Sequence, residues 1–450
     1  MSSINWISFF SLIACVSIFT YLTQKKTKDS QSYFVANRNT KLFALVATLV
    51  MTELNTSTLV GFSSLGYIYG NSAISLSFVF LIGLIFYALT VAKKWKAFDG
   101  ISVTTYFEKR YNPFIGYITA IILLIAMIGF SANYIKSLTL IFNPLFPQFN
   151  EWQLSGIFCF VMALITLRGG LKSIIQIDIV SFLITLVIFP LLYFISIQYY
   201  PSDFNSVTNQ YAFPASTLIA LIVITMFTYI LAPWYGQKIF SANSQKTALI
   251  SVCIAAVIIS AIYAIGIFSA SSLGGHSNIK IDAQNAIPYL IHHHFPIVLQ
   301  GIVYATLFFI ACTTLVGLWN TIASVFIAHH SLSATQTSLK RSILTTTVIA
   351  IFSYLLANLF IDQIFQKMVL MNIPISALAF SLLGGFYWKK VSNTASLLSI
   401  LTGCIGGTFC YLYFGEPSYM WYWAVYVIPL SFCVGILTTL VIPHRSSSRT

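Results

Sequence analysis

The residues best suited to chemistry form one short run, Thr52-Glu53-Leu54-Asn55-Thr56-Ser57-Thr58, in which six of the seven side chains are polar. The run stands inside an otherwise apolar stretch that extends from Leu42 to about Tyr67. An unpaired polar group in hydrocarbon costs about 2 to 7 kcal/mol. Such a run therefore persists only against protein or a hydrated cavity, and it predicts that something polar binds beside it.

The elements around this run are apolar helices. The chain has 450 residues, of which 58% are hydrophobic and 7% charged, whereas a soluble domain carries about 25% charged residues. A transmembrane helix needs about 20 mostly apolar residues. Thirteen such stretches begin near residues 4, 42, 73, 114, 153, 174, 214, 247, 297, 341, 368, 393 and 418. We predict an all-α integral membrane protein with about 13 transmembrane helices and no soluble domain.

The basic residues follow a membrane topology. With the N-terminus outside, 20 of the 23 Lys and Arg residues, Lys238 among them, fall on the cytoplasmic side. Only Lys136, Lys280 and Lys367 fall on or near the outer side, as the enrichment of Lys and Arg in cytoplasmic loops requires. No basic residue precedes the first stretch, which indicates a retained anchor rather than a signal peptide. The net charge of +13 thus indicates topology and not a nucleic-acid partner. We predict a cytoplasmic C-terminus.

A second interruption lies in the stretch 214–240, where Pro233 follows Thr225, Thr228 and Tyr229. Pro233 has no N–H to donate to the carbonyl four residues earlier, so it breaks or kinks a helix. The stretch is the fifth after the one that holds the polar run, and an odd offset inverts the membrane orientation of a second copy. Broken helices at both positions favour two inverted repeats over an ordinary kink and a helix contact.

The repeats give the expected domain organisation. We predict a first inverted repeat of five helices over 42–199 and a second over 214–390, with one extra helix in 1–23 and two in 391–443. Half-helix ends at the midplane expose N–H and C=O groups, which bind an anion or a cation without buried side-chain charges. The pattern is typical of a secondary transporter.

Several motifs resemble those of the sodium:solute symporter family, whose members have the LeuT-type inverted-repeat fold. The similarity covers nearly the whole chain, and the order and spacing of the motifs carry it. They are SYFVANR at 32–38, GFSSLGY at 61–67, TYFEKRY at 105–111, GGLKS at 169–173 followed by Asp178, GQKIFSA at 236–242 and FYWKK at 386–390.

The resemblance implies a sodium site between the first broken helix and the stretch that begins near residue 297. It assigns the ligands to the carbonyls of Met51, Leu54 and Ile310 and to the hydroxyls of Thr313 and Thr314. Several neutral oxygens are what a hard monovalent cation requires. Ile310 and Met51 depart from the usual small residues, as does Ser181 from a usual glutamine, but carbonyl ligands tolerate such side-chain changes.

Asp178 resembles an aspartate that some members of the family use near a second cation site. A carboxylate inside a membrane helix is a functional-site hypothesis in its own right. The alternative is a structural partner for Arg168 or Lys172, which lie 10 and 6 residues earlier. Both interpretations stay open at this point.

By the same resemblance, a set of polar side chains would line the solute cavity. These are Glu53, Asn55, Thr58, Ser77, Thr225, Thr228 and Tyr229. Their small hydroxyl groups favour a compact amino acid or carboxylate over a sugar. Glu53 stands where proline-type members carry an aspartate and sugar-type members an asparagine. It has three possible roles, which are to complete the cation site, to bind a substrate ammonium group or to take up a proton.

We therefore predict sodium-coupled symport of a small organic solute by alternating access, with Na⁺ as the coupling ion. The alternatives are a proton-coupled carrier that uses Glu53, and a solute sensor or channel that works with a separate partner. The two histidine runs, His292-His293-His294 and His329-His330, lie on opposite sides of the membrane, so no metalloenzyme is expected. On family grounds we expect a multi-pass monomer in the lipid bilayer of a bacterial inner membrane.

Overall fold

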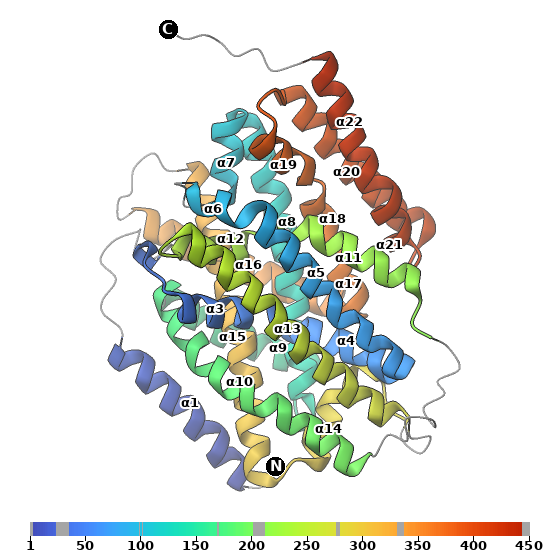
Figure 1. Ribbon diagram of the computed structural model, residues 1–450. Coiled ribbons are helices and arrows are strands. Elements are labelled where there is room, and N and C mark those ends of the chain that lie inside the picture. Colours follow the sequence, from blue (N-terminus) through green and yellow to red (C-terminus); the bar gives the residue numbers. More distant parts are fainter. Residues whose placement is uncertain are drawn as a thin grey trace.

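Helices make up nearly all of the chain that the computed structural model describes, namely residues 3–23, 36–98, 100, 102–168, 171–200, 212–275, 280–330 and 337–442. They pack against one another in a bundle (Figure 1). The α-helices are α1 Ser3–Thr23, α3 Leu42–Glu53, α4 Thr56–Tyr69, α5 Ser77–Tyr87, α6 Lys93–Ala97, α7 Val103–Arg110, α8 Pro113–Phe142, α9 Glu151–Arg168, α10 Leu171–Tyr199, α11 Ala215–Tyr229, α12 Pro233–Ser241, α13 Gln245–Gly274, α14 Ala286–His294, α15 Ile297–His330, α16 Thr337–Leu359, α17 Ile364–Leu370, α18 Asn372–Ser376, α19 Ala379–Tyr387, α20 Asn393–Phe414, α21 Tyr419–Tyr422 and α22 Ile428–Val441.

Many of these helices suit a membrane. Within the described ranges, seven helices are long and apolar enough to cross a bilayer, and nine if each of two bent pairs is one span. The predicted all-helical membrane fold is confirmed. The number of thirteen spans and the division into two repeats stay predictions.

The first predicted break lies between α3 and α4, at Leu54 and Asn55. Asn55 has an extended backbone, and its side chain accepts the N–H of Thr58 at 2.7 Å. An asparagine in this position caps a new helix, because its side chain replaces a carbonyl that the first turn lacks. The polar run thus ends one helix and starts the next.

The second predicted break lies between α11 and α12. The two helices meet at an angle of 51°. Pro233 is the first residue of α12, where its missing N–H costs nothing because no helical carbonyl is available to that position. Proline therefore fixes where the second half-helix begins.

A third break, which the sequence reading did not predict, divides the stretch 364–387. The segment formed by α17 and α18 bends by 40° from α19. Asn372 starts α18 and donates its side-chain Nδ2 to the carbonyls of Met368 at 3.0 Å and Val369 at 3.2 Å. The bend itself falls at Ala377 and Leu378, between α18 and α19, so Asn372 and Pro374 lie on the helix just before it.

The start of the first predicted broken helix and the end of the second are joined by their backbones. The N–H of Thr40 donates to the carbonyl of Ser241 at 2.9 Å, and the N–H of Asn243 donates to the carbonyl of Thr40 at 3.1 Å. The start of α3 is thereby fixed to the end of α12. These two bonds are the pairing of one isolated parallel β-bridge, between Thr40 and Ala242.

Helix α15 is the most enclosed of the long helices. In the apolar window of α15, 94% of the residues are buried, against 28% for α20. Helix α15 packs against α1, α3, α8, α10 and α16, so it forms the centre of the bundle, whereas α20 and α22 lie at one side (Figure 1).

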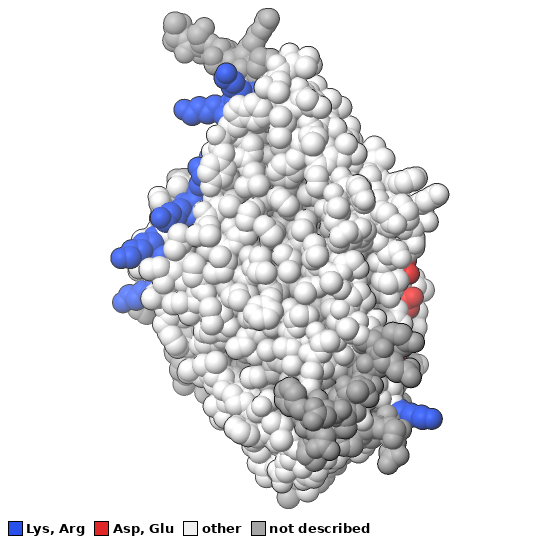
Figure 2. All heavy atoms as spheres, turned by 45° about the vertical axis from the view of Figure 1, so that its right-hand side comes forward, with Lys and Arg blue, Asp and Glu red and all other residues white. Residues whose placement is uncertain are grey.

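The charged side chains of the surface gather at its edges. Figure 2 shows Lys and Arg along one edge, with the wide face beside them almost free of charge. The ends of α7 and α19 meet, because Arg110 donates to the carbonyls of Gly385, Trp388 and Lys389. An apolar belt with a basic edge is what a helix bundle in a bilayer presents.

Candidate cation and solute sites

Four of the five oxygens that the resemblance assigns to sodium lie in one cluster between α3 and α15. The Thr314 hydroxyl donates to the Ile310 carbonyl at 2.7 Å and lies 3.3 Å from the Met51 carbonyl. The Thr313 hydroxyl lies 3.5 Å from the same Ile310 carbonyl. The fifth oxygen, the carbonyl of Leu54, belongs to the break itself. The break thus brings residues 263 positions apart into contact.

The break also explains why the Met51 carbonyl faces α15. In a continuous helix the N–H of Asn55 would bond to Met51. Here that N–H donates to the Glu53 carbonyl at 2.8 Å, and the Thr314 hydroxyl approaches Met51 in its place. The residues of this cluster are buried, with at most 6% exposure. Neutral, buried, convergent oxygens fit a hard monovalent cation.

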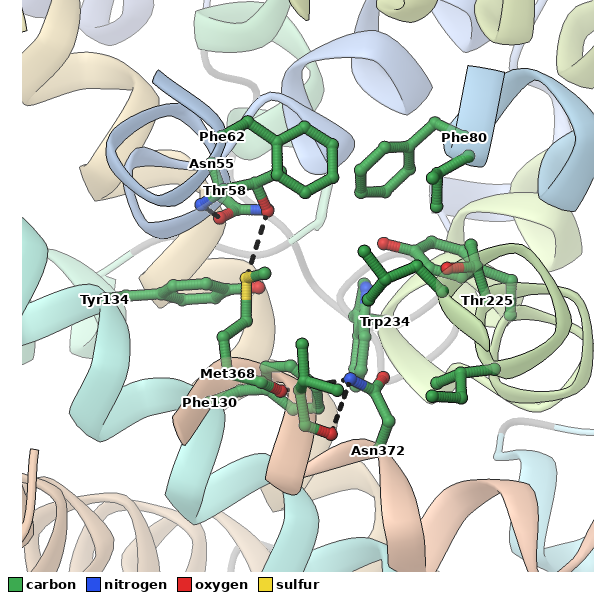
Figure 3. A pocket seen from close by; sticks show the side chains of 15 residues that line it. Asn55, Thr58, Phe62, Phe80, Phe130, Tyr134, Thr225, Trp234, Met368 and Asn372 are labelled. Atoms are coloured by element: carbon green, nitrogen blue, oxygen red, sulfur yellow. Dashed lines mark hydrogen bonds between the residues drawn. The ribbon is translucent and has the colours of Figure 1, made fainter. Parts of the chain in front are cut away.

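A cavity lies on the other side of the break, and helices from both halves of the sequence enclose it. Figure 3 shows Tyr134 and Trp234 on opposite sides of the cavity, with Phe62 and Phe80 on one wall and Asn372 on the wall facing them. The residues that line it are Asn55, Thr58, Phe62, Val79, Phe80, Phe130, Tyr134, Leu221, Ile224, Thr225, Tyr229, Trp234, Met368, Val369 and Asn372.

Four of the seven side chains that were expected at the solute cavity line it, namely Asn55, Thr58, Thr225 and Tyr229. The other three are buried outside the lining. Ser77 lies one turn before Phe80 on α5, and the Phe80 ring forms the wall there. Thr228 is fully buried, and its hydroxyl has no hydrogen-bond partner among the described residues.

Glu53, the third of these, is enclosed behind the cavity. Its side chain is 1% exposed, and the hydroxyl group that its carboxylate faces is that of Tyr229. Its carbonyl accepts the Tyr263 hydroxyl at 2.6 Å and the Asn55 Nδ2 at 3.0 Å. The aromatic hydroxyls that interact with the carboxylate electrostatically belong to Tyr87, Tyr134, Tyr229, Tyr235 and Tyr263.

Several lining residues were not anticipated from the sequence. Phe130 and Tyr134 come from α8 and Trp234 from the start of α12. Met368, Val369 and Asn372 come from α17 and α18, before the third break. A signal near this break was present, because Asn372 and Pro374 interrupt an apolar stretch just as Asn55 and Pro233 do.

Asp178 has a partner that differs from both structural alternatives. Its Oδ2 accepts the Thr48 hydroxyl at 2.5 Å and lies 3.2 Å from Nζ of Lys238. Lys238 also donates to the Thr48 hydroxyl at 2.7 Å. The side chains of Arg168 and Lys172 lie outside the described residues.

Lys238, which was counted with the cytoplasmic basic residues, is buried. Its side chain is 3% exposed, because Lys238 lies one turn before the end of α12 at Ser241 and faces Asp178 on α10. The side of the membrane on which this end of α12 lies stays a prediction. Lys238 and Asp178 form a buried ion pair that joins α12 to α10, and Thr48 adds α3.

Comparisons with known proteins fit this architecture. The model of the sodium:solute symporter family matches residues 33–403. A curated relative, the Uncharacterized symporter YidK of Escherichia coli strain K12, is 28% identical over 180 residues, which cover 39% of this chain and 32% of the relative. The chain thus matches about a third of that relative's length.

Two solved structures are also similar. A Na⁺-coupled sialic acid symporter in a substrate-bound outward-open state has a TM-score of 0.83 at 17% identity and covers 99% of both chains. MHP1, a nucleobase-cation-symport-1 family transporter with bromovinylhydantoin bound, has a TM-score of 0.62 at 12% identity and covers 93% of this chain and 98% of its own. At these identities the similarity shows the fold.

Proposed function

This chain belongs to the sodium:solute symporter family, and we propose that it imports a small organic solute together with sodium by alternating access. The protein is an integral membrane transporter and not an enzyme.

Sodium binds between α3 and α15, at the carbonyls of Met51, Leu54 and Ile310 and the hydroxyls of Thr313 and Thr314. The observation that carries this assignment is the Thr314 hydroxyl, which lies within 3.3 Å of both the Met51 and the Ile310 carbonyl. An ion at this point exchanges hydration oxygens for protein oxygens that are already close together.

The solute binds in the cavity beside the break, against Asn55, Thr58, Thr225 and Tyr229. Glu53, Ser77 and Thr228 form the layer behind that lining. Leu54 is a sodium ligand and the adjacent Asn55 is a cavity residue, so the ion and the solute share one backbone hinge. Sodium orders the hinge and thereby raises the affinity for the solute, since each ligand favours the state that the other binds.

Entry of one positive charge yields about 2.3 kcal/mol per 100 mV of inside-negative potential. That energy supports roughly a fiftyfold solute gradient, because a tenfold ratio requires about 1.4 kcal/mol.

The enclosed pair of Asp178 and Lys238 has no net charge, so we assign it a structural role at the inner end of α3 and α12 in place of a second cation site.

The orientation follows the basic edge of the molecule. We place the edge formed by α7 and α19 in the cytoplasm, the N-terminus outside and the C-terminus inside, in a bacterial inner membrane. The exposed side chains of Lys93, Lys109, Lys389 and Lys390 support this orientation.

The cation cluster and the cavity are built within one chain, so a monomer suffices for transport.

The first test is the thermal unfolding midpoint of the detergent-purified protein in sodium and in potassium at constant ionic strength. We expect a sodium-specific rise that Thr314→Ala removes, because a ligand that binds only the folded state stabilises it. Thr306→Ala is the matched control, since the Thr306 hydroxyl also donates to the carbonyl four residues earlier, at 2.8 Å, but lies away from the break. A sodium effect that survives in Thr314→Ala contradicts the assignment.

The same experiment separates the proton-coupled alternative. A proton-coupled carrier is supported if the thermal midpoint does not change with sodium but changes with pH, and if Glu53→Gln removes the change with pH. The sequence also favours an amino acid or a carboxylate over a sugar as the solute.

A further inference from the structure

The lining of the solute cavity carries no formal charge. All 15 residues that line it are apolar, aromatic, hydroxyl or amide residues. Two amides and two threonines supply most of its polarity, and the rest of the lining is largely Phe, Tyr, Trp, Leu, Ile, Val and Met. A charged solute transferred from water into such a site needs a counter-charge or a dense set of hydrogen bonds. The described lining offers no counter-charge.

The helix ends at the first break do not fill this gap. An exposed helix N-terminus binds anions through its free N–H groups. At α4, however, the Asn55 side chain already accepts the N–H of Thr58. The Glu53 carbonyl already accepts two donors, Tyr263 and Asn55. At the first break the N–H of Thr58 and the carbonyl of Glu53 are therefore already used within the protein.

Positive side chains are absent from the lining that the structure describes. Among the described residues no Lys or Arg lines the cavity, and the buried Lys238 is paired with Asp178. A carboxylate in the cavity would therefore meet no positive side chain.

The polar groups that remain available in the cavity are neutral donors and acceptors. The indole Nε1–H of Trp234 donates to no residue in the described ranges. Asn372 uses its Nδ2 toward Met368 and Val369, which leaves its Oδ1 to accept. An indole N–H can donate to a bound solute and an amide oxygen can accept from it, and an amide supplies both a carbonyl acceptor and an N–H donor.

The shape of the cavity suits a flat ring. Figure 3 shows Tyr134 and Trp234 on opposite sides, with the aromatic rings of Phe62 and Phe80 along the wall between them. Aromatic faces pack favourably against planar rings. A flexible polyol would leave several hydroxyl groups against these apolar walls without partners.

We propose, on the basis of the sodium-coupled symport argued above, that the solute is an uncharged planar compound that carries an amide, either a ring amide or a ring carboxamide. Its carbonyl accepts from Trp234 and its N–H donates to Asn372. The ring lies in the cavity against its aromatic walls. This narrows the solute class to neutral amides and excludes carboxylates, zwitterionic amino acids and sugars.

Matched pairs of compounds test the inference. The thermal midpoint is measured in sodium at pH 7 with nicotinamide against nicotinate, and with uracil against orotate, with proline and glucose alongside. We expect a saturable rise with at least one uncharged amide and none with its carboxylate partner at the same concentration. A rise with nicotinate, orotate, proline or glucose overturns the inference, as does the absence of a rise with both uncharged amides.

A single-atom change tests the assigned donor. Trp234→Phe keeps an aromatic wall but removes the N–H, and we expect the apparent Kd of the stabilising amide to rise about three- to tenfold, the usual worth of one hydrogen bond. Trp152→Phe is the control, because Trp152 lies on α9 and is 42% exposed. An unchanged Kd in Trp234→Phe, or an equal change in Trp152→Phe, overturns the role of Trp234.

The sodium effect without added solute is the separate readout for the proposed function. Loss of the sodium effect contradicts sodium coupling. An intact sodium effect with no response to the amides contradicts only the solute class.

Discussion

Two polar clusters lie against α3 and differ in kind. At Met51 the cluster consists of neutral oxygens from α3 and α15. Three residues earlier, at Thr48, it consists of a carboxylate and an ammonium group from α10 and α12. In the ion pair the two charges compensate each other. The neutral cluster has acceptor oxygens but no positive group, and it is therefore the cluster that we propose as the cation site.

The largest effect is expected from breaking the ion pair on one side. Lys238→Met leaves Asp178 as an uncompensated buried charge, which costs about 3 to 5 kcal/mol of stability. The measurement is the loss of folded protein with temperature or denaturant. Lys367→Met is the control, because Lys367 pairs at 2.9 Å with Glu416, which is 18% exposed, and exposure to solvent weakens such pairs.

The double variant Lys238→Met with Asp178→Asn sharpens this test. Removing both charges should recover most of the loss, because a buried ion pair contributes little net stability over a neutral replacement. If the double variant is as unstable as Lys238→Met alone, the instability does not come from the unpaired carboxylate. If sodium, but not potassium, restores the stability of Lys238→Met, the carboxylate of Asp178 has become a cation site.

The neutral cluster should respond to sodium and not to the state of the ion pair. At a sodium concentration one hundred times its Kd, binding stabilises the folded protein by about 2.7 kcal/mol. We expect Thr314→Ala to lose this gain and Thr306→Ala to keep it, in thermal unfolding with sodium titrated against potassium. Equal sodium responses in the two variants would remove the distinction between the clusters.

A smaller effect is expected at Asn55, which caps α4 and lines the cavity. Asn55→Ala should cost about 1 kcal/mol, the typical value of a helix cap. Because the capped turn adjoins Leu54, the apparent Kd for sodium should also rise, whereas Asn112→Ala, which removes the cap of α8, should leave it unchanged. Equal sodium affinity in both variants would contradict a shared hinge.

The smallest effect is expected from pH at α14, which lies outside both clusters. Burial and the neighbouring His293 lower the pKa of His292 and of His294 from the ordinary value of 6.5. The unfolded chain then binds protons more readily than the folded one, so stability falls as the pH drops below about 6.5. The thermal midpoint measured from pH 8 to pH 5 should show this fall, and His294→Gln should reduce it. A flat profile would contradict it.

The sequence predicted those features that depend on local signals. Asn55 and Pro233 break their helices through their own side chains, so two breaks could be located without tertiary information. Asn372 and Pro374 carry a similar signal just before the third break, which was missed because the stretch was treated as one helix. The cavity walls from Phe130, Tyr134 and Trp234 have no local signal, because aromatic residues in membrane helices usually serve packing.

The ion pair lay beyond sequence reasoning for a different reason. Asp178 and Lys238 are 60 positions apart, and they meet because α10 and α12 both pack against α3. The predicted stretch 214–240 already contained Lys238, but its partner on another helix has no local signal in the sequence. The assignment of oxygens to sodium needed the family resemblance, because a threonine pair in a membrane helix ordinarily bonds back to its own helix.

The bridge between Thr40 and the end of α12 has a consequence for mutational tolerance. Its two hydrogen bonds use only backbone groups of Thr40, Ser241 and Asn243. Substitutions that keep a small side chain at the buried positions of Thr40 and Ser241 leave both bonds in place, so the start of α3 and the end of α12 remain tied. Proline at position 40 or 243 is the exception, because it removes the N–H that each bond requires.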